Sequence, residues 1–198
     1  IALRKLNDPV TALGHFLRFD KAILLPISKG RAGYWIGRAY DELDDPAQAE
    51  QYYTSAAQHQ TSFYGLLAAE RAGLPFDVDL GGGSAVPDWR DAALAQKPLF
   101  RAGLLLQASG ELDIAERFWT HLVEQLDRNQ ATQLGQAAID MGQPHLAVMI
   151  GKRVAQRAIT LTEPYYVLHP VAQRDLPMAT EMVLAIARRE SEFDSKVQ

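Results

Sequence analysis

The sequence predicts an all-α protein in which helices come in pairs. Four segments, beginning at Lys5, Glu42, Ala108 and Asp140, each end one helical pattern, turn on Asp, Gly or Pro, and start another helix. Each new helix carries an Ala in its first turn or two. No stretch of useful length alternates apolar and polar residues as a half-buried strand does. The fold class is therefore all-α, and the segments divide the chain into blocks.

Residues 1–76 form the first block, a superhelical helix-repeat domain. The four repeats of the chain align on Ala12, Ala49, Ala115 and Ala147, and the middle interval is about twice as long as the other two. The period therefore lies in the low to mid thirties, as in tetratricopeptide-like arrays of helix pairs. Small Ala side chains let paired helices approach closely, while aromatic side chains provide surface for stacking on the next pair. These aromatic residues are Phe16, Tyr52, Tyr53, Phe118 and Trp119. Pro9, Pro46 and Pro144 fit the first helical turn, where backbone N–H groups have no partner in the helix.

Residues 77–160 form the second block, a glycine-rich connection followed by a helical linker domain. The stretch from Phe76 to Trp89 contains three consecutive glycines and a proline, and it has no helical period. A phosphate-binding loop would need a strand before it and a Lys followed by Ser or Thr at a helix start, and the sequence has neither. The stretch is therefore predicted to connect two helical blocks.

Residues 161–198 form the third block, which ends in a helix of different character. Prolines and aromatic residues replace the repeat pattern between Thr160 and Pro170. Asp175 ahead of Pro177 predicts a helix start. An Asp cap accepts a hydrogen bond from an unpaired N–H group of the first turn, and a Pro in that turn has no N–H group to pair. At about 100° per residue, Glu190 then falls on one stripe with apolar residues. These are Val183, Ile186, Ala187 and Phe193.

Two carboxylates near the end of this helix are expected to differ. Glu190 is expected against apolar neighbours, whereas Glu192, like Glu181 and Arg188, is expected on the solvated face. Burial and the negative end of the helix dipole both favour the protonated form of Glu190, which a general acid requires. The alternative is a structural carboxylate paired with Arg189 or with a distant Lys at the rim of a core.

Composition narrows the classes of partner. The 198 residues are 47% hydrophobic and 22% charged, with a net charge of −4, so no basic field draws nucleic acid. No apolar run is long enough to span a membrane. The chain has no Cys, and its five His are scattered, so no metal site is expected. The five His are at positions 15, 59, 121, 145 and 169. The absence of an initiator Met leads us to expect a processed or cut piece of a longer protein.

Two stretches resemble the soluble lytic murein transglycosylases. Residues Tyr34 to Pro75, YWIGRAYDELDDPAQAEQYYTSAAQHQTSFYGLLAAERAGLP, are similar to the helical superhelix of that family, including its Thr-Ser-Phe-Tyr-Gly element at Thr61 to Gly65. AIARRESEFDSK, Ala185 to Lys196, looks like the helix of their lysozyme-like catalytic domain that ends in a Glu-Ser pair. With the repeats between them, the two stretches cover nearly the whole chain.

The resemblance implies a periplasmic lyase that cleaves the bond between N-acetylmuramic acid and N-acetylglucosamine in peptidoglycan glycan strands. Glu190 would be the single catalytic acid/base and Ser191 would help to position the substrate, with no cofactor and no metal. The product would carry a 1,6-anhydro ring. The superhelix would guide the glycan strand and is a possible surface for other cell-wall enzymes.

The chain also departs from the family. A Gly-Leu-Met-Gln element, an Asn-containing loop and a Tyr follow the Glu-Ser helix in that family, and this sequence stops before them. The resemblance therefore covers the superhelix, the linker and the first helices of the catalytic domain, and the chain alone is expected to be inactive. The alternative function is a helical-repeat scaffold that binds proteins without catalysis.

Overall fold

The computed structural model describes residues 1–83, 85–86, 88–194 and 196, which contain helices and no strands. The predicted all-α class is confirmed. The chain divides into two compact units, Ile1–Leu80 and Gly81–Gln198. The finer division into 1–76, 77–160 and 161–198 stays a prediction. No helix in the described part of the chain combines the length and apolar character needed to cross a bilayer.

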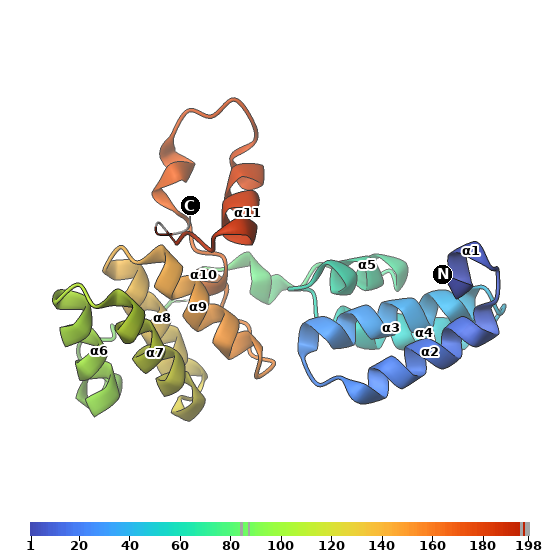
Figure 1. Ribbon diagram of the computed structural model, residues 1–198, viewed down its shortest axis with the longest axis horizontal. Helices are drawn as coiled ribbons and strands as arrows, with labels where there is room; N and C mark the ends of the chain where they lie inside the picture. The colour runs from blue at the N-terminus through green and yellow to red at the C-terminus, as the bar shows by residue number, and fades with distance from the viewer. Residues whose placement is uncertain (84, 87, 195, 197–198) are drawn as a thin grey trace. The chain divides into compact units, whose positions relative to one another are not determined.

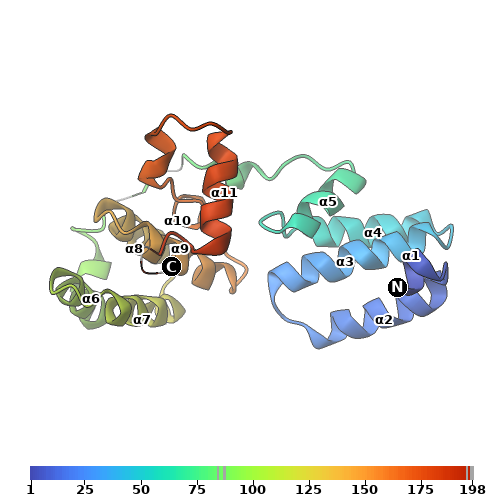
Figure 2. The same cartoon turned by 45° about the horizontal axis from the view of Figure 1, so that its top comes forward.

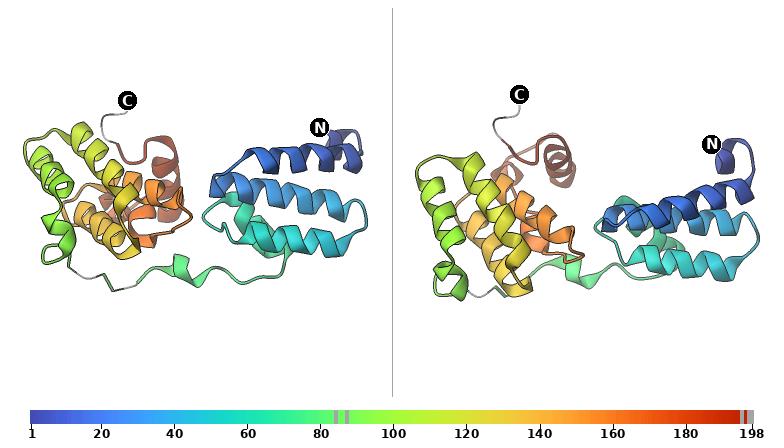
Figure 3. Two further views of the ribbon diagram at one scale, coloured as in Figure 1. Left: turned by 90° about the horizontal axis from the view of Figure 1, so that it is seen from below. Right: turned by 60° about the horizontal axis from the view of Figure 1, so that its bottom comes forward.

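The first unit is built from five helices. They are α1 (Ala2–Lys5), α2 (Pro9–Ala22), α3 (Pro26–Asp41), α4 (Pro46–Ala57) and α5 (Phe63–Arg71). Helices α2, α3 and α4 lie side by side and are joined by short turns, so that successive helices run in opposite directions (Figure 1 and Figure 3). Helix α5 packs on both α3 and α4. The core of this unit lies between these three helices.

The turn that precedes each predicted repeat helix has the same backbone conformation. Asn7, Asp44, Gly110 and Gly142 all have positive φ, and a helix begins two residues after each of them. Asn, Asp and Gly are the residues that adopt this left-handed conformation most readily. Asp8 and Asp45 then accept hydrogen bonds from backbone N–H groups in the first turns of α2 and α4. The predicted helix starts at Pro9, Pro46 and Pro144 are confirmed.

Small residues let the helices of the first unit approach closely. A Cβ at Gly33 of α3 would lie 2.8 Å from the Cβ of Ala56 in α4, and a Cβ at Gly37 would lie 2.7 Å from the ring of Tyr53. The four aligned alanines at positions 12, 49, 115 and 147 are all buried, as their alignment predicts. Close packing of this kind leaves no room for an added methylene group.

The Thr-Ser-Phe-Tyr-Gly element forms the start of α5. Ser62 caps the helix, because its hydroxyl accepts a hydrogen bond of 3.1 Å from the N–H of Gly65 and donates one of 2.8 Å to the carbonyl oxygen of His59. A Cβ at Gly65 would overlap that same carbonyl group. The element therefore specifies a tight turn into α5 in which residue 65 must be Gly.

The second unit also consists of helix pairs. Its α-helices are α6 (Pro98–Ala108), α7 (Leu112–Leu122), α8 (Arg128–Asp140), α9 (Pro144–Ala155), α10 (Thr162–Tyr165) and α11 (Thr180–Glu190). Short 3₁₀ helices cover Ala93–Gln96, Val123–Gln125 and Pro170–Gln173, and another, Val78–Gly81, spans the boundary between the two units in the sequence. Helix α6 packs on α7 and α8 on α9, while α10 contacts both α8 and α9. One apolar core, with Phe100 and Trp119 stacked at 5.2 Å, joins these helices.

Hydrogen bonds to Gln60 fix the start of the glycine-rich stretch between Phe76 and Trp89. The side chain of Gln60 is buried, donates to the carbonyl oxygen of Pro75 at 3.1 Å, and accepts from the N–H of Asp77 at 3.0 Å. Gly82 and Gly83 follow with positive φ. Two residues of this predicted connection, Ser84 and Pro87, lie outside the described residues.

Candidate functional site at the end of α11

Helix α11 begins later than the sequence predicts. Its N-cap is Ala179, which makes no side-chain cap, so the predicted start at Asp175 and Pro177 is wrong. Those residues lie in the loop that connects the 3₁₀ helix Pro170–Gln173 to α11, two elements that lie side by side (Figure 2). Both residues are exposed, and a local capping signal permits a helix start without requiring one.

Only part of the predicted stripe of α11 packs on the core. Ala187 lies against the core as predicted, together with Leu184, whereas Ile186 is 53% exposed. The packed stripe continues through Arg188 and Ser191, since these positions share one face at helical spacing. The prediction that Glu190 lies against apolar neighbours is therefore wrong, and its carboxylate is exposed.

Arg188 explains why this other stripe is buried. Its guanidinium lies 4.4 Å from the ring centroid of Tyr165 and 5.4 Å from that of Tyr166, and its Nε donates to the carbonyl oxygen of Tyr165 at 2.9 Å. The flat cation packs on aromatic faces and keeps one hydrogen bond. The prediction that Arg188 lies on the solvated face is wrong for this reason.

Glu192 is the carboxylate that the fold engages. It forms an ion pair with Lys152 of α9, and its side chain is only partly exposed. The sequence places it on the wet face, and that prediction is wrong because the chain turns sharply after Glu190. Glu192 and Phe193 both have positive φ, which is rare for residues other than Gly.

Burial of the Phe193 ring offsets the strain of this turn. The ring is 9% exposed and stacks on His169 with the ring centroids 5.0 Å apart. It joins the apolar core of the second unit. Phe193 is predicted on the packed side, and that part of the prediction is confirmed.

His145, in α9, contacts the turn at Glu192 and holds it in place. Its Nε2 lies 3.1 Å from Glu116 Oε2 and its Nδ1 lies 3.0 Å from the carbonyl oxygen of Glu192. The hydrogen bond to Glu116 raises the pKa of His145 above its ordinary value of 6.5; partial burial opposes this, and the bond to Glu192 adds to it. With acceptors at both ring nitrogens, the protonated ring can donate to both.

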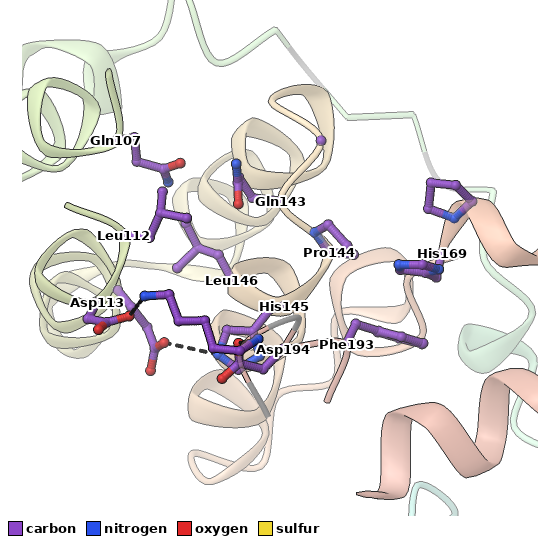
Figure 4. Close-up of a pocket in the computed structure, with 14 residues that line it drawn as sticks. Gln107, Leu112, Asp113, Gln143, Pro144, His145, Leu146, His169, Phe193 and Asp194 are labelled. Carbon is purple, nitrogen blue, oxygen red and sulfur yellow. Dashed lines mark hydrogen bonds and ion pairs between the residues drawn. The ribbon is translucent and has the colours of Figure 1, made fainter. Parts of the chain in front are cut away.

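A cleft of about 300 Å³ lies beside this turn. Its walls come from the ends of α6, α7 and α9 and from the residues that follow α11. Figure 4 shows Phe193 beside His169 and Asp194 beside His145 in this cleft, with Asp113 on the opposite wall. Glu190 is not one of the lining residues. Ser191 caps the helix, with its hydroxyl donating to the carbonyl oxygen of Ala187 at 3.1 Å.

The two predicted site residues are therefore neighbours at the end of one helix, with different environments. Glu190 is exposed and makes no ion pair or hydrogen bond within the described residues, while Ser191 is half-buried. The structure also engages His145 and Lys152, which the sequence did not assign to this region, and Arg188, which the sequence placed on the solvated face. No signal in the sequence connects them, because each contacts residues more than 20 positions away.

Metal ligands do not gather here or elsewhere in the described chain: no group of three or more His, Asp or Glu side chains is placed to hold a metal ion. Comparison with known proteins finds no matching family, no matching curated protein and no matching solved structure.

Proposed function

We propose that this chain is part of a periplasmic lytic murein transglycosylase, in which a tetratricopeptide-like superhelix precedes a lysozyme-like catalytic domain. The resemblance of Tyr34 to Pro75 and of the Glu-Ser helix to that family supports the proposal. The order of the elements agrees with it, since helix pairs come first and the helix ending in Glu190 comes last. The substrate would be the glycan strand of peptidoglycan.

One observation favours Glu190 over Glu192 as the acid/base. Glu192 is committed to Lys152, and its backbone carbonyl to His145. Glu190 is exposed at the last position of α11, so its carboxyl group can approach a bound sugar. The assignment thus rests on accessibility, and not on the burial that the sequence predicts.

The proposed reaction uses this one carboxyl group twice. Glu190 first donates its proton to the glycosidic oxygen as the bond from that oxygen to C1 of N-acetylmuramic acid breaks. It then accepts the proton of the 6-hydroxyl of the same sugar as the 6-oxygen bonds to C1. The 1,6-anhydro product needs no water and leaves Glu190 protonated for the next cycle.

A carboxyl group that starts the cycle protonated needs apolar surroundings. The described residues leave Glu190 exposed, so we propose that further parts of the catalytic domain in the parent protein cover it. Family resemblance supports this step, because the elements that complete the sugar cleft follow the Glu-Ser helix there. Ser191, held at the end of α11, would orient Glu190 and the substrate.

The test compares variants of the parent protein that carries its whole catalytic domain. Glu190→Gln keeps the shape of the side chain but cannot transfer a proton, so release of anhydromuropeptides from purified sacculi should stop. Glu181→Gln is the matched control, since it removes an exposed carboxylate from the first turn of the same helix. Mass spectrometry of the digests measures the products.

Two results would contradict the proposal. Release of anhydromuropeptides by the Glu190→Gln protein would exclude this residue as the acid/base. A parent protein that binds partners but releases no anhydromuropeptides, with Glu190 intact, would instead favour the helical-repeat scaffold.

A further inference from the structure

We propose that an aromatic-arginine cleft on the first unit binds carboxylate-bearing sugar-peptide fragments of murein. The cleft is formed by α1, α2, α3 and α5, has a volume of about 450 Å³, and lies wholly within the unit Ile1–Leu80. Its defining residues are Arg4, Phe16, Arg31, Trp35 and Tyr64. The volume is in the range of known small-molecule sites. The murein identity of the ligand rests on the proposed function.

Three aromatic rings provide a surface for stacking in this cleft. Phe16 and Trp35 are stacked with their centroids 5.9 Å apart and their planes 29° apart. Trp35 also contacts Tyr64, at 6.1 Å between centroids. All three rings are half-buried, so each keeps part of its surface open to the cleft. The C–H face of a pyranose ring buries apolar area when it packs on such rings.

Two guanidinium groups lie over these rings. Arg4 lies 5.4 Å from the ring centroid of Trp35, and Arg31 lies 5.6 Å from that of Tyr64. Stacking on a ring restricts the orientation of each cation, which leaves its N–H edge available to a ligand. Neither the Arg4 nor the Arg31 side chain makes an ion pair or hydrogen bond to another described residue. Both side chains are exposed.

The charge of the cleft is of one sign, although the chain as a whole is acidic. No Asp or Glu is among the described residues that line it, whereas the net charge of the chain is −4. His15 lies at the rim, where its Nδ1 accepts a hydrogen bond of 2.7 Å from Arg18. This charge favours a ligand that carries negative charge, and the planar fork of Arg matches a carboxylate with two parallel hydrogen bonds.

A purely structural role for the two arginines predicts a different result. Arg side chains often cover apolar surface with their stems while water solvates the charge. In that case a neutral ligand would bind as well as an anionic one, because only the rings would matter. The two explanations are therefore separated by the charge of the probe.

Calorimetric titration of the 198-residue chain with a purified disaccharide-tetrapeptide muropeptide tests the proposal. We expect saturable binding that weakens with added salt. The free tetrapeptide shows whether the peptide carboxylates suffice, and chitotetraose serves as the uncharged sugar. Chitotetraose should bind at least about tenfold more weakly than the muropeptide, which is the effect of losing one charge-assisted hydrogen-bonded contact.

Variants then locate the binding site. Arg31→Gln and Arg4→Gln should each weaken muropeptide binding by about tenfold or more. Arg117→Gln, an exposed arginine of the second unit, is the control and should bind like the parent chain. Thermal melts of the variants check that the fold is kept, and both cleft arginines are exposed enough for this to hold.

Three outcomes would overturn the proposal: no saturable binding of the muropeptide, equal binding of chitotetraose, or unchanged binding by both cleft variants. Failure here is distinct from failure of the proposed function. If both Arg4→Gln and Arg31→Gln leave binding intact while Glu190→Gln stops the parent enzyme, only the cleft proposal fails. If Arg31→Gln abolishes binding while Glu190→Gln leaves product release unchanged, only the catalytic assignment fails.

Discussion

Gly103 of α6 lies directly against the indole ring of Trp119 in α7, so a Cβ at position 103 would overlap the indole nitrogen and its neighbouring carbon. The same indole N–H donates to the carbonyl oxygen of Phe100 at 3.2 Å, one turn earlier in α6. Trp119 also stacks on the Phe100 ring, with the two planes only 3° apart. The ring is thus fixed on three sides, and α6 can approach α7 only because residue 103 has no side chain.

Gly103→Ala should therefore destabilise the second unit. Trp119 is fully buried and cannot move aside, so we expect a loss of about 1–3 kcal/mol or more in the free energy of unfolding. Gly14→Ala in α2 is the matched control, because nothing lies within 4 Å of the Cβ that it adds. That substitution should stabilise by about 0.5–1 kcal/mol, the usual gain when Ala replaces Gly inside a helix. Urea titrations of both variants give the comparison, and equal effects would contradict the packing described for Gly103.

The aligned alanines provide a second prediction. Ala49→Leu in the first unit and Ala115→Leu in the second add three carbons at buried positions between helices, so each should cost on the order of 1–3 kcal/mol. Ala22→Leu, at the exposed end of α2, should change stability little. Thermal melts of the three variants are the measurement. If the two buried variants melted like the parent, the repeat alignment would not describe the helix contacts.

Two histidines should give the two units opposite pH dependence. The pKa of His145 is raised, chiefly by Glu116, so the folded second unit binds this proton more tightly than the unfolded chain does. Its contribution to stability is complete below about pH 6.5 and is lost as the pH rises through the raised pKa. The pKa of His59 is lowered by burial and by Lys29, so its contribution to the stability of the first unit is complete above about pH 6.5 and is lost as the pH falls through the lowered pKa.

Tryptophan fluorescence can separate the two effects. Trp35 is the only Trp of the first unit, and Trp89 and Trp119 are in the second. In a Trp35→Phe background, unfolding of the second unit should become easier as the pH rises, and His145→Gln should flatten that dependence. His59→Gln in the same background should leave it unchanged. If the pH dependence of unfolding persisted in the His145→Gln variant, another titratable group would be its cause.

The sequence determined those features of this protein that depend on neighbouring residues. Asp8-Pro9 and Asp45-Pro46 specify helix starts, because capping and a fixed proline φ act within one turn. The aligned alanines and helical periodicity specified the all-α class and the buried positions of the repeats. The local helical pattern also predicts that the adjacent residues Glu190 and Ser191 lie at the end of α11.

The tertiary structure decided which face of α11 is buried. Two similarly apolar stripes of this helix share Ala187, one running through Val183 and Ile186 and the other through Leu184, and the helical period cannot choose between them. The choice depends on Tyr165 and Tyr166, because the guanidinium of Arg188 packs on their rings. It also depends on Lys152, which forms an ion pair with Glu192. The cleft at Trp35 was equally hidden, because its residues come from four helices. Burying a polar side chain costs free energy through loss of water, and a hydrogen bond or ion pair with a distant residue offsets that cost. Only the folded chain brings such partners together.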